Sequence, residues 1–118
     1  MLHEKRTKMQ RELANKKCRP CEKGTSPLKA EALVNFQRQL GDGWKVVDEH
    51  HLEKEFRFKD FREALDFTNR IGAIAEQEGH HPDIFLSWGK VKLELWTHSV
   101  GGLSENDFIL AAKADSAR

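Results

Sequence analysis

The feature of this 118-residue sequence that most constrains its fold is a pair of alternating stretches around position 90. Apolar residues occupy every second position in residues 84–88, and again in residues 91–95. Alternation with a period of two is typical of a strand that buries one face. Gly89 and Lys90 separate the two stretches, and a two-residue connection with glycine first predicts a β-hairpin. Part of the chain is therefore expected to form an antiparallel sheet.

The predicted turn also fixes a register for the two strands. It pairs their apolar residues on one face, as Trp88 with Val91, Leu86 with Leu93, and Ile84 with Leu95. Continued outward, the same register places His81 opposite His98 on the other face. Side chains at opposed positions have Cβ atoms about 4.5–5.5 Å apart. The hairpin therefore predicts that these two histidines share one small patch.

The rest of the sequence predicts a second hairpin and three helices. Residues 44–47 and 52–58 are the candidate strands, with His50 and His51 in or beside the polar turn between them. Apolar residues at helical spacing predict helices over residues 27–40, over residues 60–78 and after residue 104. Ser26, Asp60 and Ser104 are the expected N-caps of these helices. The predicted fold is α+β, a four-stranded antiparallel sheet with three helices on one face, in the order α-β-β-α-β-β-α.

Charge divides the chain into two regions. Residues 1–23 carry eight Lys/Arg and three Glu, a net charge of +5, whereas residues 24–118 carry −4. We therefore expect a basic, flexible N-terminal extension over residues 1–24 and one domain over residues 25–118. The total net charge of +1 predicts no direct binding of nucleic acid.

No apolar run reaches the roughly 18 residues of a membrane span, and no signal-peptide core is present, so we expect a cytoplasmic protein without membrane contact.

The only two cysteines, Cys18 and Cys21, have the Cys-x-x-Cys spacing found in redox pairs and in halves of zinc sites. A structural zinc site takes about four ligands, and the sequence contains no second cysteine pair. No predicted strand and helix flank the motif in the manner of a thioredoxin-like site. The sequence therefore favours a peripheral turn.

The residues best suited to proton transfer gather at the end of the second predicted helix and beyond it. Glu76 lies one helical turn before His80 and His81, and His98 follows the second strand of the hairpin. Imidazole is the side chain that most readily gains or loses a proton near neutral pH. An isolated histidine pair is more often a polar connection, and Asp107 alone is explained as a helix cap. The combination favours acid/base chemistry at this corner.

These residues form an ordered pattern that resembles the pterin-4a-carbinolamine dehydratases, also called 4a-hydroxytetrahydrobiopterin dehydratases. The pattern is Glu76, three residues, His80-His81-Pro82, five residues, Trp88, nine residues, His98, eight residues and Asp107. Further stretches similar to the family are Gly43-Trp44, Phe58-Lys59-Asp60-Phe61, Thr97-His98 and Gly102-Leu103-Ser104. The resemblance covers residues 26–115, and the order of the predicted elements agrees with the family fold. Ser99 and Gly79 stand where some members carry an acidic residue.

The resemblance implies a reaction, the removal of water from 4a-hydroxytetrahydrobiopterin to give quinonoid dihydropterin, which recycles tetrahydrobiopterin after an aromatic amino-acid hydroxylase has used it. This reaction needs no metal and no organic cofactor. The resemblance implies that His80, His81 and His98 are catalytic, and it leaves open which imidazole is the acid and which the base. It implies pterin-binding roles for Glu76, Gly79, Pro82, Thr97, Ser99, Trp44 and Asp107. A homodimer or homotetramer with a pterin as its substrate is expected.

Two other functions fit parts of the sequence. Some family members serve as dimerisation cofactors of a transcription factor, and a protein-binding module here would present Arg62, Asp66, Asn69 and Arg70 on the second helix. A metal-dependent hydrolase is the other alternative. The three histidines have no obvious set of carboxylate ligands beside them, which disfavours a catalytic metal.

Overall fold

The computed structural model describes residues 7–20 and 24–118, so Cys21 lies outside the described residues. The helices are α1 (Lys8–Asn15), α2 (Ala30–Arg38), α3 (Phe61–Glu78) and α4 (Glu105–Ala117). The strands are β1 (Lys45–Val47), β2 (His51–Arg57), β3 (Asp83–Ser87) and β4 (Lys90–Leu95). They form one antiparallel sheet in the order β1-β2-β4-β3. The α+β class and the four-stranded sheet are confirmed, and α1 is an additional helix before the three expected ones.

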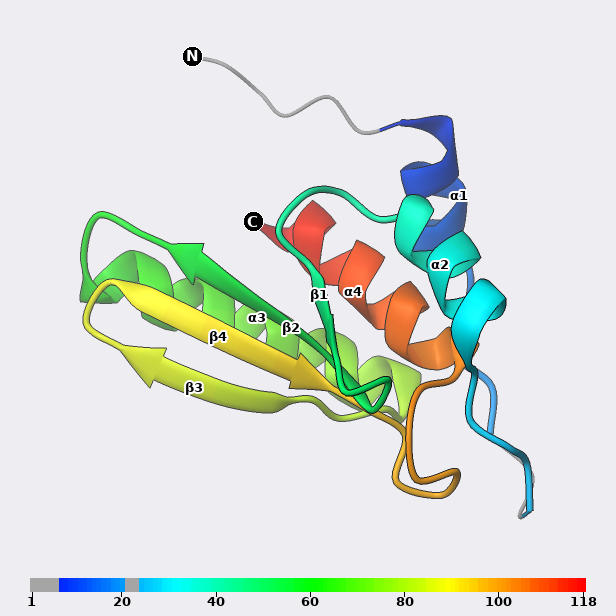
Figure 1. Cartoon of the computed structure of the whole chain (residues 1–118). Helices are drawn as coiled ribbons and strands as arrows, with labels where there is room; N and C mark the ends of the chain where they lie inside the picture. The colour runs from blue at the N-terminus through cyan, green and yellow to red at the C-terminus, as the bar shows by residue number, and fades with distance from the viewer. Residues whose placement is uncertain (1–6, 21–23) are drawn as a thin grey trace.

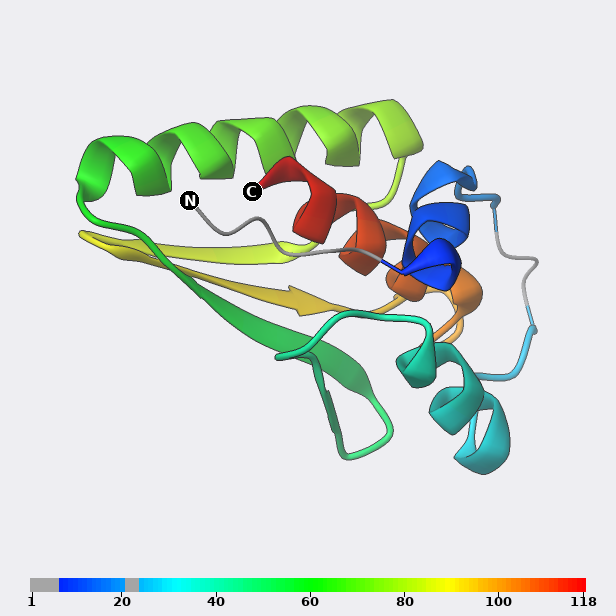
Figure 2. The same cartoon turned by 90° about the horizontal axis from the view of Figure 1, so that it is seen from above.

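The helices α3 and α4 pack on the same face of the sheet (Figures 1 and 2). That face is apolar because β2 and β4 direct every second side chain toward the helices. The largest fully buried side chains of this core include Leu52, Phe56, Phe67, Ile71, Leu93, Leu95 and Phe108. Within the described ranges, no helix combines the length and the apolar character that crossing a membrane requires.

The β3–β4 hairpin has a different turn from the one predicted. Trp88 and Gly89 form the turn, and Ser87 pairs with Lys90. The apolar pairs are Leu86 with Val91 and Ile84 with Leu93. The predicted register was therefore wrong by two residues, although a shift of two leaves every strand residue on its predicted face.

A contact with β2 explains the shifted register. The Gly89 carbonyl accepts a hydrogen bond from the Phe58 N–H at 2.9 Å, and a Cβ added to Gly89 would lie 3.0 Å from the Phe58 carbonyl oxygen. This glycine therefore permits a close approach to the neighbouring strand, which the pattern of the hairpin alone does not reveal. Because of the shift, a continued ladder would place Trp96 opposite His81, so the predicted pairing of His81 with His98 was also wrong.

Helix α2 begins at Ala30, three residues later than predicted, and Ser26 is not its N-cap. The N-cap is Lys29, whose side chain makes no capping hydrogen bond. The N–H of Leu28 instead donates to the carbonyl of Leu103 at 2.8 Å, which holds the preceding residues against the loop before α4. The position of this segment therefore depends on the hydrogen bond between Leu28 and Leu103, and not on a local side-chain cap at Ser26.

The starts of α3 and α4 and the end of α3 agree with the sequence. The Asp60 carboxylate caps α3 by accepting from the Glu63 N–H at 2.9 Å. Gly79 ends this helix with a left-handed φ of 65°, a conformation that glycine adopts without strain. Ser104 and Asp107 form a capping box at the start of α4. These three caps fix the ends of the helices that carry the candidate site.

Helix α1 packs against α4 (Figure 1). Leu13 is only 1% exposed in this contact. Lys113 on α4 donates to the Ala14 carbonyl at 2.6 Å, and Lys16 pairs with Glu105 at 2.8 Å. The N-terminal region therefore contributes an apolar side chain and polar contacts to the folded domain.

Replacing Leu13 with alanine is expected to lower the free energy of unfolding by about 2–5 kcal/mol, because a buried leucine leaves a cavity. Met9, on the same helix but 49% exposed, is the matched control. Met9→Ala is expected to change the same quantity by less than about 0.5 kcal/mol. Urea unfolding of the full-length variants measures both, and equal stabilities of the two would contradict the packing of α1.

Candidate functional site

The candidate site begins where α3 ends. The left-handed Gly79 turns the chain at the end of the helix, and the His80 N–H donates to the Ala75 carbonyl at 3.2 Å. The His80 side chain is consequently held close to the start of α4, and only 12% of it is exposed. A helix end stabilised in this way fixes the backbone from which the imidazole projects.

The His80 ring contacts a fully buried carboxylate. Its Nε2 lies 2.6 Å from Asp107 Oδ1, and Asp107 is 0% exposed. The other oxygen, Oδ2, accepts from the Thr97 hydroxyl at 2.8 Å and from the Ser104 N–H at 2.9 Å. A buried carboxylate is costly unless it is hydrogen-bonded, and these three donors satisfy both of its oxygens. Asp107 is therefore both a helix cap and the partner of His80.

The contact with Asp107 defines which nitrogen of the His80 ring carries a proton. An ionised carboxylate only accepts hydrogen bonds, so His80 must carry a proton on Nε2 to make the contact. The second ring nitrogen, Nδ1, is then left to take up or release a proton. A carboxylate that fixes the tautomer and orientation of a histidine is a recurring arrangement in acid/base catalysis.

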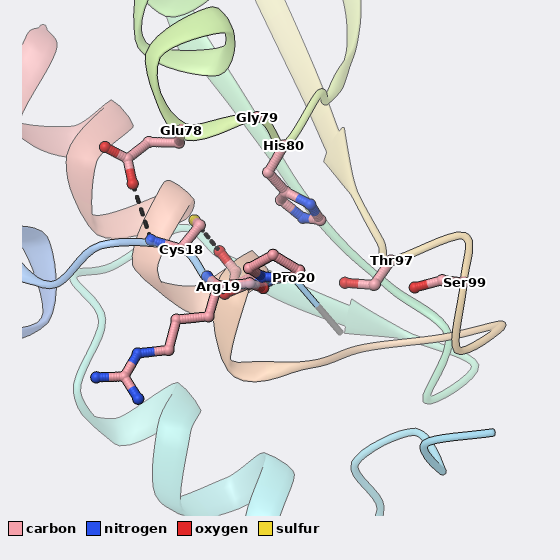
Figure 3. Close-up of a pocket in the computed structure, with 9 residues that line it drawn as sticks. Cys18, Arg19, Pro20, Glu78, Gly79, His80, Thr97 and Ser99 are labelled. Carbon is pink, nitrogen blue, oxygen red and sulfur yellow. Dashed lines mark hydrogen bonds between the residues drawn. The ribbon is translucent and has the colours of Figure 1, made fainter. Parts of the chain in front are cut away.

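A pocket of about 310 Å³ lies beside His80. It brings together Gly79, His80, Thr97 and Ser99, four residues singled out by sequence (Figure 3). Its other lining residues are Cys18, Arg19, Pro20, Glu78 and Asn106. Small-molecule sites occupy about 300–1,000 Å³, so the volume suits a compact ligand.

The other two histidines lie outside the residues that line this pocket. His81 is exposed, and its Nε2 lies 2.5 Å from Glu76 Oε2. His98 is also exposed, and its ring lies against Trp96 at a tilt of 36°, with 3.9 Å between ring centroids. Each imidazole therefore has a different neighbour, a carboxylate for His81 and an indole for His98.

Trp44 lies in the core rather than among the pocket-lining residues. Its indole N–H donates to Asp115 Oδ2 at 3.0 Å, and Lys54 donates to Asp115 Oδ1 at 2.7 Å. All three side chains are buried or nearly so. Pro82 is half-buried between His81 and the start of β3.

Sequence reasoning missed the residues from the N-terminal region that line the pocket. Cys18, Arg19 and Pro20 were interpreted as a peripheral turn, yet they line the pocket together with His80 (Figure 3). Burial, with the nearby Glu78 carboxylate as a further cause, raises the pKa of the Cys18 thiol to about 12. No local pattern connects residues 18–20 with Asn106, so the sequence offered no signal for this contact.

A separate group on the outer face of the sheet has the composition of a metal site. In the part of the chain that the structure describes, His51, Glu53 and Glu94 place ligand atoms within 4.8 Å of one another. Lys92 already lies 3.1 Å from Glu94, and this hydrogen bond raises the pKa of the Lys92 ammonium. The lysine partly neutralises the carboxylates, so the group is explained as an ion-pair cluster without a metal.

Comparison with known proteins identifies the family. A family model described as pterin 4 alpha carbinolamine dehydratase matches residues 26–117. A protein of Alkaliphilus metalliredigens (strain QYMF), named "Putative pterin-4-alpha-carbinolamine dehydratase", is 58% identical over 103 residues, covering 87% of this chain and 93% of the relative. A protein of the same name from Rubrobacter xylanophilus is 56% identical over 104 residues, covering 88% of this chain and 96% of the relative. The chain belongs to the pterin 4 alpha carbinolamine dehydratase family.

Solved structures agree with this assignment. The crystal structure of a transcriptional coactivator/pterin dehydratase from Brucella Melitensis matches with a TM-score of 0.73 and 33% identity, covering 78% of this chain and 98% of the other. A pterin dehydratase-like RuBisCO assembly factor of the alpha-carboxysome shares the fold, with a TM-score of 0.55 and 23% identity. The fold therefore occurs in proteins that are described as having different roles.

The raised pKa of Cys18 predicts an unusual pH dependence of alkylation. Only the thiolate reacts, so the rate should rise about tenfold per pH unit between about pH 7 and about pH 10 without reaching a plateau. In denaturant the same cysteine should react at half its maximal rate near its ordinary pKa of about 8.5, and should reach a plateau by about pH 10. Residue-resolved mass spectrometry after iodoacetamide treatment distinguishes Cys18 from Cys21. A plateau reached by about pH 10 in the folded protein would contradict the burial of this thiol.

Proposed function

We propose that this chain dehydrates 4a-hydroxytetrahydrobiopterin to quinonoid dihydropterin plus water by histidine acid/base catalysis. In this reaction the C4a–O bond breaks, one proton joins the departing hydroxyl to form water, and one proton leaves a ring nitrogen. The protons balance and no electron donor or acceptor takes part, so a positioned acid and a positioned base are sufficient. Each such group typically accelerates a reaction by about 10²–10⁴-fold.

The observation that carries this proposal is the His80–Asp107 contact at the edge of a pocket. Asp107 holds the imidazole in one orientation with the proton on Nε2, which leaves Nδ1 for exchange with a ligand. Thr97 supports the same carboxylate and also lines the pocket. The reacting edge of the pterin would lie against His80, with Gly79, Thr97 and Ser99 around it.

The remaining histidines have supporting roles in this proposal. His98 flanks the reacting edge from the loop after β4, where Trp96 supports its ring. His81 contributes to proton transfer or to pterin binding, and Glu76 orients it through their hydrogen bond. Pro82 fixes the backbone after the pair, while Trp44 supports the domain from its core position.

The cellular setting follows from the proposed reaction. A dehydratase of this kind recycles tetrahydrobiopterin in the cytoplasm after an aromatic amino-acid hydroxylase has oxidised it. We further propose that the chain works as a homodimer or homotetramer. The basic segment before residue 25 lies entirely before the match to the family model, which begins at residue 26.

A protein-binding role is the second candidate. Arg62, Asp66, Asn69 and Arg70 are all exposed on α3, and Arg70 donates to the Ala117 carbonyl at 2.7 Å. This polar helix face is available to a partner independently of the pocket. A His80→Ala variant that loses dehydration but keeps a partner would separate the two roles.

Replacing His80 with alanine is expected to lower kcat for dehydration by about 10²–10⁴-fold, because one acid/base group is lost. The decay of enzymatically generated 4a-hydroxytetrahydropterin, followed by ultraviolet absorbance, measures this rate. Asp83→Asn is the matched control, since Asp83 is exposed and lies just beyond the histidine pair. The control should keep the wild-type rate.

The same assay tests the proposal as a whole. A chelator added to wild type should leave the rate unchanged, because the proposed chemistry uses only side chains of the protein. Wild-type protein that is folded but gives no acceleration would contradict the dehydratase assignment. An unchanged rate in His80→Ala would contradict the role given to this imidazole.

A further inference from the structure

The N-terminal segment is attached to the pocket by an unusually complete backbone contact. The Arg19 N–H donates to Asn106 Oδ1 at 2.9 Å, and Asn106 Nδ2 donates to the Arg19 carbonyl at 2.5 Å. One side-chain amide therefore satisfies both backbone polar groups of one residue, as a neighbouring strand would. This pairing joins parts of the chain that are 87 positions apart.

A second side chain holds the preceding residue. Glu78 Oε1 accepts a hydrogen bond from the Cys18 N–H at 2.8 Å, and the Glu78 side chain is only 8% exposed. The Cys18 thiol lies 3.6 Å from the Asn106 carbonyl oxygen, to which it donates. Lys113 lies 4.0 Å from Glu78 and balances its charge. Asn106 and Glu78 together are called the clamp below.

The clamp lies next to the proposed catalytic pair in both segments of the chain. Asn106 directly precedes Asp107 on α4, and Glu78 lies two residues before His80 at the end of α3. Residues 18–20 bridge these two segments and form the side of the pocket that faces His80 (Figure 3). The position of this segment is thereby tied to the position of the imidazole and its carboxylate.

The backbone of this segment, rather than the Arg19 guanidinium, forms the pocket side. In Figure 3 the Arg19 side chain extends away from His80, Thr97 and Ser99. Pro20 and Cys18 lie on the pocket side of the same segment. The shape of the pocket should therefore depend on where the clamp holds residues 18–20, and little on the charge of Arg19.

We propose that Asn106, together with Glu78, is a positioning residue that holds residues 18–20 as one wall of the pterin pocket, and that this wall determines how tightly a reduced pterin binds. The inference rests on the proposed function of the pocket. In this proposal the wall shapes the pocket and supplies neither the acid nor the base, so it contributes equally to binding of the substrate and of the transition state. Loss of such uniform binding raises KM and leaves kcat unchanged.

Two substitutions at one position test this inference. Arg19→Pro removes the N–H that donates to Asn106 and leaves both clamp side chains intact. Arg19→Ala removes the guanidinium and keeps the N–H, so it is the matched control. Arg19→Pro should raise KM for 4a-hydroxytetrahydropterin by about 3- to 10-fold at unchanged kcat, the usual effect of a lost hydrogen bond. Arg19→Ala keeps the backbone N–H, so it should raise KM by less than Arg19→Pro does.

Alkylation of Cys18 reports on the wall without any catalytic assay. Opening the clamp exposes the thiol, so iodoacetamide should label Cys18 at least about tenfold faster in Arg19→Pro than in wild type, and at the wild-type rate in Arg19→Ala. Asn106→Ala opens the clamp from the other side and should reproduce both effects of Arg19→Pro. Thermal unfolding checks that each variant is folded at the assay temperature.

The outcomes separate the inference from the function on which it rests. Faster labelling with an unchanged KM, or unchanged labelling in both clamp-opening variants, would overturn the inference and leave the dehydratase assignment intact. If wild type shows no dehydration, titration with 7,8-dihydrobiopterin replaces KM by Kd. Weaker binding by Arg19→Pro would then support the wall while the proposed reaction fails, and equal or absent binding would overturn the wall as well.

Discussion

The arrangement of this protein depends on one buried carboxylate. Asp107 has no exposed surface, so its charge must be satisfied by donors within the protein. The donors come from three separate places: the end of α3, the segment after β4 and the start of α4. Because the Asp107 side chain requires all three donors, the carboxylate that caps α4 also sets the position of His80. The helix cap and the candidate catalytic group are thus parts of one hydrogen-bond network.

The N-terminal region completes this network from the outside. The match to the family model begins at residue 26, yet Leu13 is buried against the domain and residues 18–20 line the pocket. The clamp formed by Asn106 and Glu78 flanks the two residues of the carboxylate–imidazole pair. The pocket of this chain is therefore built from the family domain together with a segment that precedes it. Differences in that segment would change the pocket without altering the histidines.

The sequence predicted the features that local chemistry determines. Alternating strands identified the sheet, and Asp60, Gly79 and Ser104 correctly marked helix ends, because each acts within a few residues of its own position. The hairpin register failed because Gly89 serves a contact with Phe58, the residue that follows β2. The start of α2 failed because Leu28 bonds to Leu103. The pocket wall was missed for the same reason, since Arg19 and Asn106 are brought together only by the tertiary fold. The motif indicated the candidate reactive residues, but it did not indicate that Asp107 binds His80 while Glu76 binds His81.

The most direct test of this account is the tautomer of His80. Nitrogen-15 NMR of histidine-labelled protein at alkaline pH, where imidazoles are neutral, distinguishes a proton on Nε2 from one on Nδ1. We expect the neutral ring of His80 to carry its proton on Nε2, where Asp107 accepts it, with His98 as an internal comparison in the same spectrum. A neutral His80 with its proton on Nδ1 would mean that the carboxylate does not orient the imidazole, and would contradict the role proposed for the pair.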